Sequence, residues 1–176
     1  MIGIILNQKF KKIRIMKKIL SYMFIATMAV IMGTMASCSK DDDLPKVKIT
    51  LEVNDETASV VNDTIYVVQG ETIKIDAVKV TSLEEGKSAA INQVGYYWDG
   101  VFLFPSPVAP FPAEIPVLEK AEVGMHGLGL RCQVLVVDYP ICFAYLQYPV
   151  KVLPKGDPLP KGTAKIIEKH SKLDKE

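Results

Sequence analysis

The chain has 176 residues, with 21 basic side chains, 20 acidic side chains and three cysteines. Residues 1–37 hold six of the basic side chains and no acidic one, which leaves 15 basic and 20 acidic side chains in residues 38–176. This remainder of 139 residues, with a net charge of −5, suits one domain and excludes a large multidomain enzyme. Nucleic acid is not expected as a partner, because the basic excess is confined to the first 37 residues.

An uncharged, apolar run covers residues 19–36 and directly follows Lys17 and Lys18. Basic residues, an apolar stretch and then small residues predict a secretory signal peptide over residues 1–37. Met16 begins a typical signal of this kind, so we expect translation to start there. An uncleaved membrane anchor is the alternative, because the run is close to the shortest helix that spans a bilayer.

The residues that end this run resemble a bacterial lipobox: Met35, Ala36 and Ser37 stand directly before Cys38. Met35 departs from the leucine that is usual at its position. The resemblance implies that residues 1–37 are removed and that Cys38 is acylated, with this covalent lipid as the only attached group. Several acyl chains together give stable membrane attachment, whereas a single chain binds only marginally.

A short charged run, Lys40, Asp41, Asp42 and Asp43, follows the cysteine. It resembles the export signal of surface lipoproteins of the Bacteroidetes. The resemblance implies a lipid-anchored protein of the outer membrane, on the cell surface, with the periplasmic face as the alternative. A solvated acidic tether over residues 38–45 is the other interpretation of the same run.

Apolar and polar residues alternate from residue 46 to residue 153, and no segment has helical periodicity. About seven short strands separated by turn signals predict an all-β, antiparallel sandwich of immunoglobulin type over residues 46–153. Five prolines between residues 105 and 116 predict a loop or an edge strand there. Trp98 is expected at the centre of the core, as the largest apolar side chain on an inward-facing position.

Several short motifs resemble bacterial Ig-like domains, over roughly residues 70–153. They are Val94 to Gly100, Pro110-Phe111, Gly124 to Leu128, Val134 to Asp138, and the final strand Val150-Lys151-Val152. Tyr139-Pro140-Ile141 departs from the glycine and asparagine usual after the aspartate. The resemblance implies a non-catalytic spacer, adhesive or accessory module.

The tail over residues 154–176 begins with a stretch rich in proline, glycine and lysine, which predicts a linker. Ile166, Ile167, His170 and Leu173 could share one side of a helix of about eleven residues, which is marginal alone. We therefore expect a flexible or short helical tail.

Two cysteines remain after Cys38. A tight hairpin around residues 139–141 would pair Cys132 with Tyr148 and place the thiols of Cys132 and Cys142 about 20 Å apart. A disulfide needs Cα atoms within about 7 Å. The pattern therefore predicts two buried free thiols.

No constellation points to catalysis or to a metal. His126 and His170 lack other ligands at zinc-site spacing. Paired carboxylates such as Glu84-Glu85 lie in loops, without apolar neighbours that would raise a pKa. We therefore expect no enzyme, no metal and no cofactor.

Two groups of side chains are candidates for contact with a partner. If even-numbered residues of the last hairpin point inward, four apolar residues point outward: Leu135, Val137, Phe143 and Tyr145. They form a contact surface for a protein, another copy or sugar rings, or else the loop over 101–118 or the tail covers them. A second aromatic group near the proline-rich loop comprises Tyr97, Phe102, Phe104 and Phe111.

Thr64 lies in Asp63-Thr64-Ile65, which resembles the O-glycosylation acceptor of Bacteroidetes envelope proteins. Together, these patterns predict a lipid-anchored envelope lipoprotein whose non-catalytic domain is a binding or structural module. The alternative is a glycan-binding accessory lipoprotein of a polysaccharide-uptake system.

Overall fold

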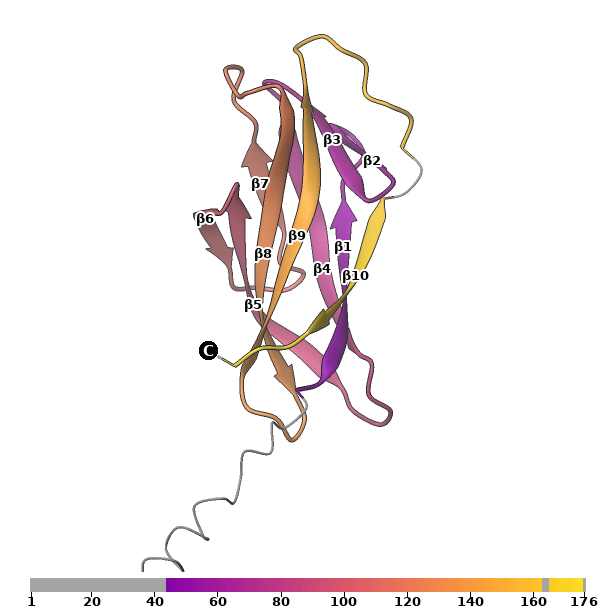
Figure 1. Cartoon of the computed structure of the whole chain (residues 1–176), viewed down its shortest axis with the longest axis vertical. Helices are drawn as coiled ribbons and strands as arrows, with labels where there is room; N and C mark the ends of the chain where they lie inside the picture. Colours follow the sequence, from indigo (N-terminus) through magenta and orange to yellow (C-terminus); the bar gives the residue numbers. More distant parts are fainter. Residues whose placement is uncertain (1–43, 163–164, 176) are drawn as a thin grey trace, which may run out of the picture. The chain divides into compact units, whose positions relative to one another are not determined.

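A computed structural model describes residues 44–162 and 165–175 of the chain. These residues contain ten β-strands and no helix (Figure 1). The strands are β1 (Lys46–Val53), β2 (Ala58–Val61), β3 (Thr64–Val68), β4 (Thr72–Ser82), β5 (Ala89–Trp98), β6 (Val101–Ser106), β7 (Ala113–Pro116), β8 (Gly124–Val136), β9 (Cys142–Leu153) and β10 (Ile166–Lys172). The predicted signal peptide, lipobox and export signal lie outside the described residues.

The strands form two sheets that pack face to face. One sheet has the order β10-β1-β4-β7 and the other has the order β2-β3-β9-β8-β5-β6. Neighbouring strands are antiparallel except β3 and β9, which are parallel. The orders β1-β4-β7 and β9-β8-β5-β6 match the A-B-E and G-F-C-C′ strands of an immunoglobulin sandwich. The prediction of an all-β Ig-like sandwich is therefore confirmed, with more strands than the seven expected and with one parallel pair, β3 and β9, in a sandwich predicted to be antiparallel.

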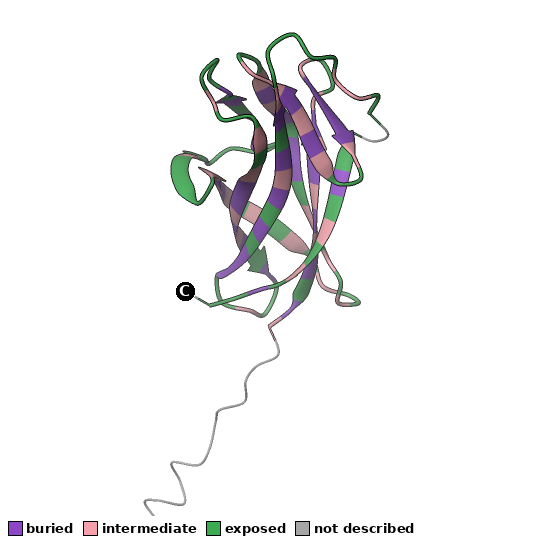
Figure 2. Ribbon diagram, turned by 45° about the horizontal axis from the view of Figure 1, so that its top comes forward, coloured by how far each residue is buried: buried purple, intermediate pink, exposed green. Residues whose placement is uncertain are grey.

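Alternating residues of both sheets build the core, as the period-two pattern predicts. In β1, Val47, Ile49 and Leu51 are fully buried between more exposed neighbours, and Figure 2 shows the same alternation along other strands. Tyr96 and Tyr148 are the largest fully buried side chains. Burying these alternating apolar faces against each other removes them from water and stabilises the sandwich.

Trp98 is not the central core residue, so this prediction was wrong. Its side chain is only partly buried and packs at the margin of the core. The reason is its position at the last residue of β5, directly before the turn at Asp99-Gly100. Tyr96 lies two residues earlier on the same face, is fully buried, and donates a 2.6 Å hydrogen bond to the carbonyl of Phe111.

The tail also differs from the prediction, because residues 166–172 form a strand and not a helix. β10 pairs antiparallel with β1, in a register that joins Leu51 to Ile167 and Lys46 to Lys172. Ile167 and, just beyond the strand, Leu173 are fully buried. The open edge of β1 supplies backbone partners for a segment too short to hold a helix alone.

The register of the last hairpin differs from the predicted one, because each residue of β8 pairs with a residue of β9 that lies four positions earlier than predicted. Cys132 pairs with Ala144 and Val134 pairs with Cys142, because the connection over residues 137–141 is longer than a tight turn. The two cysteines are therefore diagonal neighbours on the inward face and not about 20 Å apart. Both are buried free thiols, so the predicted redox state agrees with the structure although the geometry behind it was wrong.

Candidate functional site

A groove of about 750 Å³ opens between β6 and β7, each of which is an edge strand of its own sheet. It lies on the side of the sandwich where β6 and β7 appear together in Figure 1. Most of its lining is apolar and comes from the end of β5, from β6, from β7 and from the loop that follows β7. The lining residues are Trp98, Asp99, Val101, Phe102, Leu103, Phe104, Ile115, Pro116, Val117, Leu118, Ala121, Glu122 and His126.

The turn between β5 and β6 sets one wall of the groove. Asp99 and Gly100 have φ angles of 48° and 82°, the left-handed pair that makes a two-residue hairpin turn. The turn brings Val101 and Phe102 back along β5, where they remain 67% and 53% exposed. β6 carries no charged residue, although native edge strands are usually protected by charge.

A polar cluster forms part of the groove wall, and His126 is its centre. Nδ1 of the ring lies 2.7 Å from the Asp99 carboxylate, and Nε2 lies 2.8 Å from the carbonyl oxygen of Glu122. The ring stacks on Trp98 with a centroid separation of 5.2 Å. The backbone N–H of Gly127 donates a 2.7 Å hydrogen bond to the other oxygen of Asp99. The cluster thus ties the β5–β6 turn to the start of β8.

The protonation of this cluster follows from its contacts. The hydrogen bond with Asp99 raises the pKa of His126 above its ordinary value, in spite of partial burial. Burial opposes ionisation of Asp99, but the hydrogen bonds from His126 and Gly127 outweigh it, so the pKa of this carboxyl group is lowered. The contact between His126 and Asp99 therefore favours the charged form of each partner.

The surface predicted on the last hairpin divides into an exposed and a covered part. Leu135, Val137 and Tyr145 are 42%, 55% and 54% exposed. Phe143 is buried: the Arg131 guanidinium lies 4.0 Å from its ring centroid, and its backbone pairs with Asp174 of the tail. The four residues therefore do not form one continuous exposed surface.

The second aromatic group is closer to the groove. Phe102 and Phe104 line it, whereas Phe111 is buried and packs in the core. The Tyr97 ring meets Phe102 edge-on at 5.3 Å. Sequence reasoning found this apolar wall but missed the polar cluster, because Asp99 and His126 are 27 residues apart. The Asp-Gly turn was the available signal, since it marks where β5 reverses.

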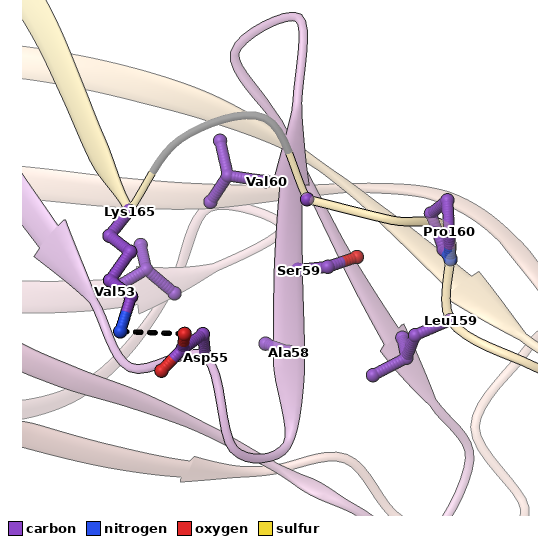
Figure 3. Close-up of a pocket in the computed structure, with 9 residues that line it drawn as sticks. Val53, Asp55, Ala58, Ser59, Val60, Leu159, Pro160 and Lys165 are labelled. Carbon is purple, nitrogen blue, oxygen red and sulfur yellow. Dashed lines mark ion pairs between the residues drawn. The ribbon is translucent and has the colours of Figure 1, made fainter.

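A more polar hollow lies beside β2, beneath the segment over residues 159–162 (Figure 3). Asp55 and Lys165 form a 2.6 Å ion pair across it. The Ser59 hydroxyl faces no hydrogen-bond partner within residues 44–162 and 165–175. Gly162 lies against the backbone of Val60, so this segment covers the outer edge of β2.

The remaining predicted positions carry no assembled site. Thr64 begins β3 at the β2–β3 turn, and His170 is exposed on β10. The part of the chain that the structure describes has no group of three or more metal-ligating side chains. It also has no helix long and apolar enough to cross a bilayer.

Comparison with known proteins adds little to this geometry. No family model matches the chain, and no curated protein matches it. Among solved structures, it is similar to fibronectin(III)-like modules of Clostridium thermocellum CbhA, with 15% identity and a TM-score of 0.36. The similarity covers 56% of this chain and 96% of that one. The fold assignment therefore rests on the strand order, and the similarity carries no functional inference.

Proposed function

We propose that the protein is a lipid-anchored, non-catalytic binding module of the bacterial cell envelope that holds a protein partner in the groove between β6 and β7. The observation that carries the binding function is the groove itself. Its exposed wall, Val101 and Phe102, is apolar, uncharged and open to solvent. An exposed apolar patch of this kind on a folded domain is typical of an interaction site.

The groove suits a protein segment better than a sugar. Its lining is almost wholly apolar, and its three ionisable residues, Asp99, Glu122 and His126, lie in one cluster. There the Asp99 carboxylate and the His126 ring are hydrogen-bonded to each other, and Glu122 contributes its backbone carbonyl oxygen to the ring. A sugar ring needs many free hydrogen-bonding groups around an aromatic platform, whereas apolar side chains of a protein need only the surface that Phe102 and Leu103 provide.

Site-specific photocrosslinking in intact cells tests the binding function. A photoreactive residue at position 101 should give a discrete crosslinked product, which a Phe102→Ala substitution in the same chain abolishes. Position 83, whose leucine is 46% exposed outside the groove, is the matched control. Identical products from positions 101 and 83 would count against the groove as the binding site.

The anchor rests on the sequence of residues 35–43, with Cys38 as the lipidated residue. Labelled palmitate should be incorporated into the wild-type protein and not into a Cys38→Ala variant. Protease treatment of intact cells should degrade a surface protein and spare a periplasmic one. Equal labelling of both variants would refute lipidation at Cys38.

Glycan binding is the second candidate, favoured by Tyr145. Its ring is 54% exposed on the outward face of β9, and its hydroxyl accepts a 3.0 Å hydrogen bond from Nε of Arg131. An exposed tyrosine held in one orientation is a platform on which a sugar ring can stack. Binding on a glycan array that is lost in Tyr145→Ala and kept in Phe102→Ala would favour this function over the groove.

A further inference from the structure

The hydrogen bonds of His126 determine its charge. A neutral imidazole has one N–H donor and one acceptor nitrogen, whereas an imidazolium has two donors. Nδ1 faces a carboxylate oxygen of Asp99, and Nε2 faces the carbonyl oxygen of Glu122. Both partners are acceptors only, so both contacts are hydrogen bonds only when both ring nitrogens carry a proton.

We propose that His126 is a proton-operated latch, which in its doubly protonated form ties the loop before β8 to the β5–β6 turn in the wall of the groove. The inference concerns a device in the fold, and it holds whether or not the groove binds a protein. It rests on three elements that the ring joins: Trp98 and Asp99 at the end of β5, Glu122 in the loop, and β8, which carries His126 itself.

The charged groups around the ring all favour the closed state. Among the described residues, Asp99 from the turn and Glu122 from the loop are the charged side chains that act on His126, and both favour the imidazolium. Trp98 packs on the ring face without charge. The His126 side chain is only 12% exposed, so water does little to replace these partners.

Loss of one proton breaks one particular contact. The bond to Asp99 joins two opposite charges and is the stronger of the two, so the remaining proton stays on Nδ1. The lone pair of Nε2 then faces the lone pairs of the Glu122 carbonyl, which repel it. The loop remains held at Ala121, whose carbonyl accepts a 2.6 Å hydrogen bond from the Gln69 side chain. Opening is therefore confined to the chain around Glu122.

The test uses a chain with one histidine. The sequence has only two, so His170→Gln, at an exposed site on β10, leaves His126 alone in the nitrogen NMR spectrum. The latch predicts that both ring nitrogens keep imidazolium shifts well above pH 6.5, the ordinary midpoint. On further titration, the Val123 amide should shift with the same midpoint. The emission of Trp98, the only tryptophan, should also follow it.

Asp99→Asn is the matched variant, because asparagine also tolerates the left-handed φ of 48° and preserves the turn. It removes the charge and should lower the proton affinity of His126 several-fold, which moves the titration midpoint of the ring to lower pH. A midpoint at or below pH 6.5 in the His170→Gln chain would overturn the proposal. So would a high midpoint at which the Val123 amide does not move, since His126 would then be a fixed cation and not a latch.

Discussion

Ile167 on β10 offers a decisive test of the structure of the tail. Its side chain is fully buried and lies opposite Leu51 of β1, whereas its neighbour Ile166 is 49% exposed and lies opposite Glu52. Ile167→Ala removes buried methyl and methylene groups and leaves a cavity. Ile166→Ala removes the same atoms from a surface position. The two variants are therefore matched in chemistry and differ only in the face of the strand.

Truncation of a buried isoleucine to alanine costs about 2–5 kcal/mol of unfolding free energy. A surface substitution of the same kind costs about 0.5 kcal/mol or less. With a urea m-value of about 1–3 kcal/mol/M, a loss of 3 kcal/mol lowers the unfolding midpoint by about 1–3 M. This shift is large against a total stability of about 5–15 kcal/mol for a domain of this size.

Urea titration followed by circular dichroism measures both midpoints. The structure predicts a large decrease for Ile167→Ala and almost none for Ile166→Ala. Equal midpoints for the two variants would refute the reasoning, because a frayed tail or a helix detached from the sandwich would bury neither side chain. Leu173→Ala, beyond the strand but also fully buried, should behave like Ile167→Ala.

Three further predictions follow from other parts of the sandwich. Burial raises the pKa of Cys132 to about 12 and also raises the pKa of Cys142, so a thiol reagent at pH 8 should label neither in the folded domain and both in urea. The raised pKa of His126 stabilises the folded domain, and this stabilisation is complete below about pH 6.5 and lost as the pH rises through the pKa that His126 has in the folded state. The urea midpoint should therefore fall as the pH rises, and it should fall less in His126→Gln. Gly100 has a φ of 82° and open space around it, so Gly100→Ala should lower the unfolding free energy by about 1–2 kcal/mol through the backbone conformation alone. Urea titration checks this loss against an alanine substitution at an exposed position of β6.

The alternating pattern allowed the strands and their inward faces to be predicted from the sequence. Even-numbered residues of β8 and β9 point inward as expected, and β1 begins and ends close to the predicted bounds. Period two is a local property, set by the pleat of each strand. It carries no information on which residues lie opposite one another, so the pairing of Cys132 was predicted four residues away from its real partner.

The features that sequence reasoning missed depend on contacts between distant segments. β10 is a strand because β1 offers it an edge 120 residues away, as the Lys48–Glu168 ion pair illustrates. The hydrogen-bonded cluster of His126 likewise joins a turn and a loop that no local motif connects. Long-range pairing overrides weak local preference, so a short segment with two adjacent isoleucines fitted helix and strand equally well.

The pairing of β10 with β1 also fixes the order in which the domain can form. Among the strands that the structure describes, β1 is the first along the chain and β10 is the last. The four-stranded sheet can therefore acquire its outer strand only after the other nine described strands have been synthesised. Until then, Leu51 and its neighbours lack the cover that Ile167 provides, and β1 presents a bare edge. The last described strand thus completes the sheet to which the first described strand belongs.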